Sequence, residues 1–94
     1  MARATFNGVV IAESEDTIEV EGNLYFPLAC LDRQYTEPSE VTTNCPWKGE
    51  ASYFDIVVDG QRAEYAAWYY PSPKDAAAEI ADRVAFWRGV EVSA

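Results

Sequence analysis

The sequence predicts a mainly β domain, α+β at most, built from antiparallel strands with one short helix near residues 73–83. Turn-forming residues recur about every eight to twelve positions, which is the spacing of strands joined by hairpins. Valine, isoleucine and aromatic residues fill the runs between these turns. The 94 residues include no linker, repeat or low-complexity stretch, so one domain over residues 1–94 is expected.

The first half of the chain is expected to supply short strands at residues 4–12, 17–21 and 24–26. In the second of these, alternation places Ile18 and Val20 inside and the glutamates in water. Gly22 and Asn23 are expected to turn the chain, and Pro27 ends the third strand. A further strand is expected at 41–45, after a less regular segment.

The second half is dominated by a predicted hairpin over residues 51–70. Two sets of side chains are expected to point to opposite faces of its first strand: Phe54, Ile56 and Val58, and Tyr53, Asp55 and Val57. Asp59-Gly60 is a strong two-residue turn signal, because both positions of such a turn have positive φ. In the returning strand, Trp68 and Tyr70 are expected on one face, and Tyr65, Ala67 and Tyr69 on the other.

The predicted helix has a marked beginning. Ser72 is a candidate N-cap, Pro73 suits the first helical position, and Asp75 follows three residues after the cap. An apolar stripe continues along the helix at Ala76, Ala77, Ile80 and Val84. After the helix, residues 84–87 and 90–92 are expected to form one closing strand interrupted by Gly89.

The composition excludes several partners. Sixteen acidic and seven basic side chains give a net charge of −9, which repels the phosphates of nucleic acid. No run of apolar residues is long enough to cross a bilayer, and no signal peptide is visible, so a cytoplasmic protein with two free thiols, Cys30 and Cys45, is expected. Homo-oligomerisation is left open.

The segment Cys45-Pro46-Trp47-Lys48-Gly49 has two interpretations. Pro46 suits a type I turn and Gly49 the left-handed residue after it, which together make a common hairpin loop with a bulge. Cys45 is then a small buried hydrophobe. Alternatively, the Lys48 ammonium lowers the pKa of the Cys45 thiol and makes it nucleophilic, so Cys45 is the catalytic candidate if there is one.

The absence of histidine restricts enzymatic chemistry. Serine and cysteine triads need a histidine base, and the common zinc sites use histidine or four cysteines. Neither a metal nor another cofactor is therefore expected. The phosphate-binding glycine loops and the paired aspartates of nucleotidyl-transfer sites are also missing from the sequence.

An aromatic pocket is the favoured functional interpretation. If Tyr53 reaches the same face as Trp68, these rings form the walls of a pocket with Lys48 at its mouth, where it attracts an anionic group. The alternative is that the rings belong to the core or to a patch that contacts another protein.

Several motifs resemble one family. Thr43-Asn44-Cys45-Pro46-Trp47-Lys48-Gly49 followed by Ala51-Ser52-Tyr53 is similar to the central motif of the bacterial domain-of-unknown-function 427 family. The segments 6–12, 25–27, 67–71 and 84–86 also match its pattern. The resemblance implies a compact, β-tent-like domain, without the paired C-x-x-C zinc motifs of many β-tent relatives. The family has no established activity, although a nucleotidyltransferase label is sometimes attached to it.

The resemblance also implies a set of recurring polar and aromatic positions, which fall on Cys45, Lys48, Tyr53, Trp68 and Tyr70. These are the positions that the residues themselves select. The leading hypothesis is a non-enzymatic binding module with an aromatic-lined pocket for a small, anionic or aromatic ligand. The alternatives are an enzyme that uses Cys45 with Lys48, for thiol chemistry or nucleotidyl transfer, and a protein-interaction or dimerisation module.

Overall fold

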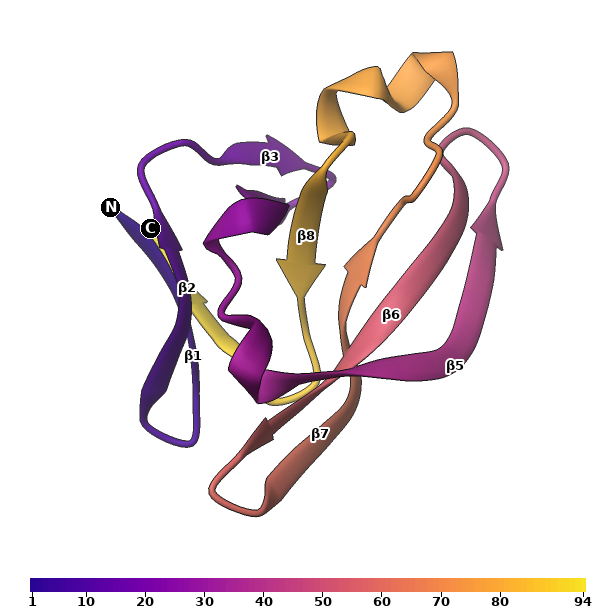
Figure 1. The fold of residues 1–94 in the computed structure, drawn as a ribbon. Helices are drawn as coiled ribbons and strands as arrows, with labels where there is room; N and C mark the ends of the chain where they lie inside the picture. Colours follow the sequence, from indigo (N-terminus) through magenta and orange to yellow (C-terminus); the bar gives the residue numbers. More distant parts are fainter.

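The computed structural model describes residues 1–94 as two antiparallel sheets (Figure 1). The smaller sheet has the order β2-β1-β9, and the larger has the order β3-β4-β8-β7-β6-β5. The strands are β1 (Ala2–Phe6), β2 (Val9–Ser14), β3 (Ile18–Val20), β4 (Asn23–Pro27), β5 (Thr36–Cys45), β6 (Gly49–Val58), β7 (Gln61–Tyr69), β8 (Arg83–Phe86) and β9 (Glu91–Ser93). The mainly β fold class predicted from the sequence is confirmed.

Two-residue turns connect three of the hairpins. Asp59 and Gly60, with φ of 49° and 80°, turn β6 into β7 as predicted. Asn7 and Gly8 have nearly the same geometry, so the strand expected over 4–12 is two strands, β1 and β2. The turn between β3 and β4 is made by Glu21 and Gly22 rather than by Gly22 and Asn23, because Val20 pairs with Asn23.

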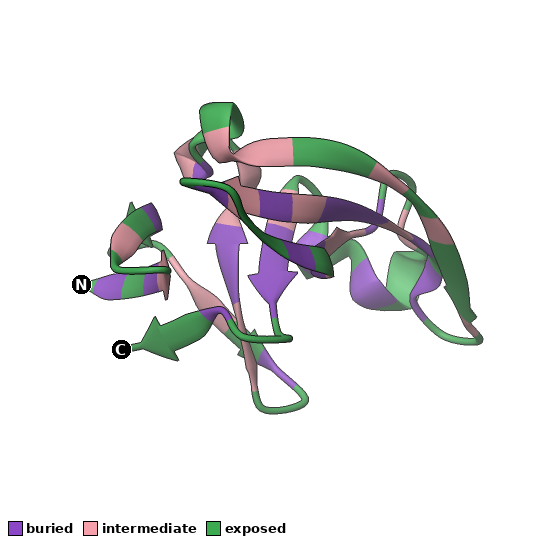
Figure 2. Ribbon diagram, turned by 90° about the horizontal axis from the view of Figure 1, so that it is seen from below, coloured by how far each residue is buried: buried purple, intermediate pink, exposed green.

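The main core lies between the two sheets. This inter-sheet core consists of fifteen buried residues that are alanine, aliphatic or phenylalanine. They are Ala2, Ala4, Ile11, Ala12, Phe26, Leu31, Phe54, Ile56, Val58, Ala63, Ala66, Ala67, Val84, Phe86 and Val90. Figure 2 shows the buried segments gathered in the interior, with exposed segments along the outer strand β5 and the turns. Phe54, Ile56 and Val58 share one face, as alternation predicts.

A second, smaller cluster packs elsewhere on the larger sheet. This aromatic face consists of Val20, Tyr25, Ala51, Tyr53, Tyr70, Ala77, Ile80 and Ala85, with Cys45, Tyr65 and Trp68 among the partly buried residues against it. Ala77 and Ile80 come from the 3-10 helix η3 (Asp75–Ile80), which lies at the end of the molecule that also holds the β5–β6 turn (Figure 1).

The helix itself is shorter than predicted. Its N-cap is Lys74 rather than Ser72, and Ala77 interrupts it with φ of −121°. Two buried side chains, Ala77 and Ile80, are enough to anchor one short segment, whereas Val84 already belongs to β8. Two further 3-10 turns, η1 (Leu28–Cys30) and η2 (Arg33–Tyr35), lead from β4 to β5.

The predicted closing strand is also divided. β8 pairs with β4 and β7 in the larger sheet, whereas β9 pairs with β1 in the smaller one. Arg88 and Gly89, both at positive φ, redirect the chain between them. Because the two parts pair in different sheets, the C-terminal segment joins the sheets and ends beside the N-terminus (Figure 1).

Candidate functional site

The register of β6 and β7 brings two of the predicted site residues together. Tyr53 lies directly opposite Trp68, so the two side chains are on the same face of the sheet. Trp68 in turn lies opposite Ala85 of β8, whose small side chain leaves space beside the indole. The condition on which the pocket hypothesis depended, that Tyr53 and Trp68 share a face, is therefore met.

A bulge changes the face of Tyr65. The register of β6 and β7 shifts between Phe54 and Ile56, and Tyr65 has φ of 38°. Its backbone N–H donates to Oδ1 of Asp55 at 2.8 Å. The expectation that Tyr65 and Trp68 lie on different faces of the sheet is wrong. The extra residue of the bulge rotates the Tyr65 ring toward Tyr53, and the two ring centroids are 6.2 Å apart.

The same bulge also holds the side chain of Trp87 beside Trp68. Nε1 of Trp87 donates to the carbonyl oxygen of Tyr65 at 2.6 Å, and its ring meets Trp68 edge-on at 5.9 Å. The Arg88 guanidinium lies over the Tyr65 ring at 4.1 Å and donates from Nε to the carbonyl of Glu64. These contacts fix Trp87 although the residue is 44% exposed.

These side chains surround a cavity of about 310 Å³, here called the aromatic cavity. Its lining residues are Asn23, Lys48, Tyr53, Trp68, Tyr70 and Trp87. Four of the five sequence-predicted site residues are among them: Lys48, Tyr53, Trp68 and Tyr70. The volume falls at the lower end of the range of small-molecule sites.

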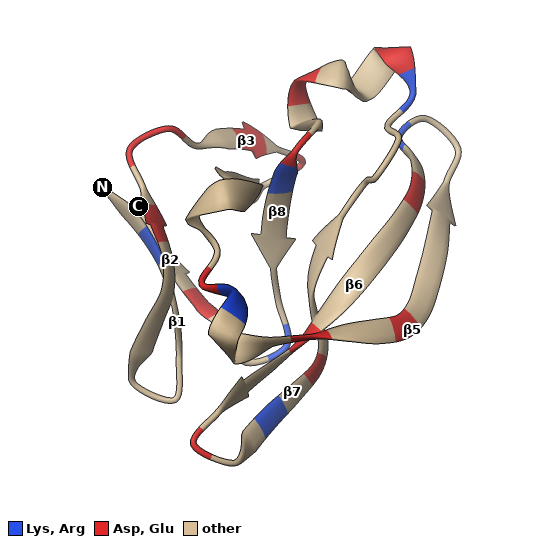
Figure 3. Cartoon of the chain, viewed as in Figure 1, with Lys and Arg blue, Asp and Glu red and all other residues tan.

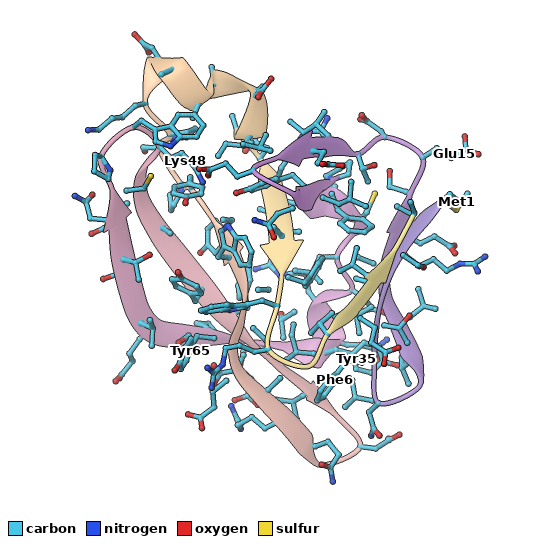
Figure 4. The ribbon with its side chains drawn as sticks, turned by 180° about the vertical axis from the view of Figure 1, so that it is seen from behind. Met1, Phe6, Glu15, Tyr35, Lys48 and Tyr65 are labelled. Carbon is cyan, nitrogen blue, oxygen red and sulfur yellow. The ribbon has the colours of Figure 1, made fainter.

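Lys48 carries the only buried charge of the molecule. Its ammonium forms an ion pair with Oε1 of Glu21 and lies 5.1 Å from the Trp47 ring centroid and 5.7 Å from that of Tyr70. Burial alone would lower the pKa of Lys48, but the hydrogen bond to Glu21 and the nearby Tyr25 and Tyr70 together leave it raised. Lys48 is therefore a permanent cation at neutral pH. Figure 4 shows it at the end of the molecule where η3 lies.

The tyrosines of the cavity carry hydroxyl groups that differ in their hydrogen bonds. Burial raises the pKa of Tyr70 above its ordinary value, with an opposing contribution from the Lys48 charge. The hydroxyl of Tyr53 shares a hydrogen bond of 2.9 Å with Oγ1 of Thr43 on β5. Trp68 donates from Nε1 to the hydroxyl of Tyr25 at 3.1 Å.

The loop before β6 has its glycine at positive φ, as predicted, and positions Lys48. Cys45 pairs with Gly49, and Gly49 has φ of 109°. A side chain at Gly49 would approach the carbonyl oxygen of Ser72 to 3.4 Å, so glycine also permits close packing here. The backbone N–H of Lys74 donates to the carbonyl of Lys48 at 2.9 Å and its Nζ to that of Pro46 at 2.7 Å.

Cys45 is the predicted site residue that does not line the cavity. It is half-buried at the end of β5 and packs against the aromatic face. The Lys48 ammonium is directed at Glu21 and at the rings of Trp47 and Tyr70. The arrangement therefore favours a packing role for Cys45.

Two other hollows are larger, at about 480 and 500 Å³, but have fewer apolar side chains. Arg62, in the larger of them, already bonds to Asp55 and Glu37 at 2.7 and 2.8 Å. Acidic residues are spread over both sheets and their turns (Figure 3), but no three His, Cys, Asp or Glu side chains are grouped so that they could hold a metal ion. No helix has the length and apolar character of a membrane-crossing segment.

Three residues of the site were missed in the sequence. Asn23 and Glu21 flank Gly22, whose turn signal was recognised but placed one residue late. Trp87 gave no local signal, because it reaches the cavity only through the pairing of β8 with β7 and the bulge at Tyr65.

Fold and cavity together define a small antiparallel β domain that carries an aromatic cavity on its larger sheet. The family model described as domain of unknown function (DUF427) matches residues 1–94. The chain therefore belongs to this family, as the resemblance of its motifs indicated. No curated protein matches it significantly.

Proposed function

We propose that this protein is a binding module for a small, flat organic ligand that enters the aromatic cavity. The observation that carries the proposal is the convergence of four aromatic side chains and one buried cation on a single cavity: Tyr53, Trp68, Tyr70, Trp87 and Lys48. Aromatic walls with a few converging polar groups are typical of small-molecule sites. The rings offer stacking surface, and Lys48 attracts an anionic substituent.

The surface properties of the rings support this function. Nε1 of Trp68 and Nε1 of Trp87 are both engaged within the chain, so the indoles offer the ligand apolar faces and edges. Their orientation is set by hydrogen bonds before any ligand arrives. Such preorganisation lowers the entropic cost of binding.

The enzymatic alternatives have less support. Cys45 lies outside the lining of the cavity, so a thiolate reaction there would not use the aromatic walls. The cavity contains a single cation, Lys48, and Glu21 already balances it, which suits nucleotidyl transfer poorly because phosphates are usually held by several cations or backbone N–H groups.

The interaction alternative rests on a specific observation. Trp47 and Trp87 are 39% and 44% exposed, and large exposed aromatics are enriched where proteins meet. Concentration-dependent sedimentation that Trp47→Ala and Trp87→Ala both abolish would favour a contact with a second copy.

The binding function is tested by a thermal-shift screen against aromatic acids, nucleotides and neutral aromatic metabolites. A ligand present at ~100 times its Kd stabilises the folded chain by about 2.7 kcal/mol. We expect Trp68→Ala to lose the shift, and Lys48→Met to lose it for anionic ligands, because methionine keeps the apolar stem but removes the charge. Arg3→Met is the control, since Arg3 is exposed on the smaller sheet and outside the lining. Equal shifts in all four proteins, with circular dichroism unchanged, contradict the proposal.

A further inference from the structure

The polar groups left for a ligand lie together in the aromatic cavity. Lys48 uses one of its three donors on Glu21, and neither the carboxamide of Asn23 nor the hydroxyl of Tyr70 hydrogen-bonds to another group of the chain. Lys48 lies over the Tyr70 ring, and its partner Glu21 is two residues from Asn23. The cavity therefore has one polar end and otherwise aromatic walls.

The ion pair at this polar end is asymmetric. The side chain of Lys48 is 9% exposed, whereas that of Glu21 is 54% exposed. The Glu21 carboxylate is already largely hydrated, so its own desolvation does not hold it in place, whereas Lys48 is covered by the chain. A lysine charge left in a desolvated site without an anion is strongly unfavourable. When Glu21 leaves, an anionic group of a ligand is therefore favoured in its place.

The backbone at Glu21 gives an independent reason to assign this carboxylate a role beyond forming the turn. Glu21 has φ of 54° in the turn before Gly22, a position where asparagine, aspartate and glycine are the preferred residues. A glutamate there costs about 1 kcal/mol or more relative to glycine. The longer side chain is what allows the carboxylate to reach Lys48.

We propose that the ligand of the aromatic cavity is a planar aromatic or heteroaromatic monocarboxylate, whose carboxylate replaces that of Glu21 on the Lys48 ammonium. This inference rests on the proposed binding function. Glu21 is then an internal competitor that occupies the anion position of the empty cavity. The ring of the ligand stacks between Trp68 and the tyrosines, and Asn23 and Tyr70 satisfy the remaining carboxylate lone pairs.

The charge balance selects a carboxylate over a phosphate. The exchange replaces one carboxylate with another, so the charge around Lys48 stays the same. A phosphate monoester brings nearly two negative charges to a site with one cation, on a chain whose net charge is −9. The only other lysine, Lys74, donates to the carbonyl of Pro46.

Exchange also makes the site selective. A neutral ring leaves Glu21 on Lys48 and gains only stacking, whereas a ring with a carboxylate gains both contacts but has to displace Glu21. Competition by Glu21 lowers the apparent affinity for the acid by the fraction of molecules in which Lys48 is free. Removal of the Glu21 charge is therefore expected to strengthen the binding of aromatic acids and to leave the binding of neutral analogues unchanged.

The test uses benzoate and benzamide, which share a ring and differ in charge. The probes are titrated while the indole N–H resonances of Trp68 and Trp87 are followed by nuclear magnetic resonance. In Glu21→Gln we expect benzoate to bind roughly tenfold more tightly than in the wild type, since removal of a like charge next to a ligand anion is worth at least this much. Benzamide is expected to change by less than about twofold. Glu19→Gln, which removes an exposed charge from the adjacent strand β3, serves as the matched control.

Three results overturn the inference. If both probes bind but Glu21→Gln leaves benzoate unchanged or weaker, the exchange is wrong while the binding function stands. If phenyl phosphate binds more tightly than benzoate, the ligand class is wrong. If no probe shifts the Trp68 and Trp87 resonances in any variant, the binding function fails and the inference with it. Glu21→Asn, which suits the turn backbone, repeats the titration in case glutamine destabilises the turn.

Discussion

The inter-sheet core and the aromatic face share strands β4, β6 and β8 but differ in chemistry. From β6, Phe54, Ile56 and Val58 enter the inter-sheet core, whereas Ala51 and Tyr53 enter the aromatic face. The inter-sheet core contains no polar side-chain atom, and both sheets cover it. The aromatic face contains buried hydroxyl groups and borders a buried cation, and η3 covers only part of it. Packing explains the first region completely, whereas the second also holds polar groups, among them the Tyr70 hydroxyl, that hydrogen-bond to no other group of the chain.

The difference between the two regions is tested most strongly by Phe26→Ala. Phe26 is fully buried in the inter-sheet core and meets Phe86 edge-on at 5.5 Å. Its truncation removes a large buried ring and leaves a cavity, which is expected to lower the free energy of unfolding by about 3–5 kcal/mol. Urea unfolding followed by circular dichroism measures this loss.

Trp87→Ala is the comparison variant, because Trp87 belongs to the rim of the aromatic cavity and is 44% exposed. Its effect on stability should be clearly smaller than that of Phe26→Ala, while its effect on ligand-induced shifts should be large. Similar losses of stability in both variants would show that the rim is part of the folding core.

A second prediction concerns the bulge that separates the faces. Asp55 accepts the Tyr65 N–H at 2.8 Å and the Arg62 guanidinium at 2.7 Å, and its side chain is 17% exposed. Asp55→Asn keeps the size but removes the charge that strengthens both bonds, so a loss of about 1–3 kcal/mol is expected. The indole resonance of Trp87 should also move, because Trp87 donates to the Tyr65 carbonyl.

Asp59→Asn is the matched control for this change. Asp59 is exposed in the β6–β7 turn at φ of 49°, where asparagine is equally well accepted. The stability of this control should stay close to that of the wild type. An Asp55→Asn protein that matches the control in stability and in its Trp87 resonance contradicts the role given to Asp55.

Local sequence signals were sufficient for the features that depend on neighbouring residues. The Asp59-Gly60 turn, the Pro46 to Gly49 loop and the alternation in β6 each have their physical cause within a few residues. The Asn7-Gly8 turn belongs to the same class and could have been predicted, because Asn-Gly is among the strongest hairpin signals. Without this turn, residues 4–12 are predicted as a single strand, whereas the structure has β1 and β2.

The rest could not be predicted because its causes lie far apart in the sequence. The face of Tyr65 depends on a carboxylate from the facing strand, and the pairing of Lys48 with Glu21 depends on the order of six strands. The same order brings Trp87 beside Trp68. Alternation within one strand contains no information on these contacts.

A third prediction tests whether the hydroxyl groups of the aromatic face stabilise the fold. Tyr53→Phe removes the 2.9 Å hydrogen bond to Thr43 and leaves the ring in place, so a loss of about 0.5–1.5 kcal/mol is expected. Thr43→Val removes the same bond from the other side. A double-mutant cycle measured by urea unfolding should show that the two losses do not add. Additive losses would mean that the bond contributes nothing.

The smallest effect is expected from Tyr70→Phe, and only at alkaline pH. The hydroxyl of Tyr70 hydrogen-bonds to no other group of the chain, so near pH 7 the variant should be about as stable as the wild type. Burial raises the pKa of Tyr70, and the contacts with Glu21, Tyr25 and Tyr70 raise that of Lys48 despite its burial. The folded chain therefore holds both protons more tightly than the unfolded chain does.

The sign of the alkaline effect follows from this difference. The stabilisation is fully present below the unfolded pKa values, near pH 10, and is lost as the pH rises through the raised folded values. Tyr70→Phe removes the contribution of the phenol, so its free energy of unfolding should fall less steeply above about pH 10 than that of the wild type. Urea unfolding at a series of pH values measures the two slopes. Equal slopes would mean that the Tyr70 phenol titrates in the folded chain as it does in the unfolded chain, and that the end of the aromatic face around Lys48 is far better hydrated than the inter-sheet core.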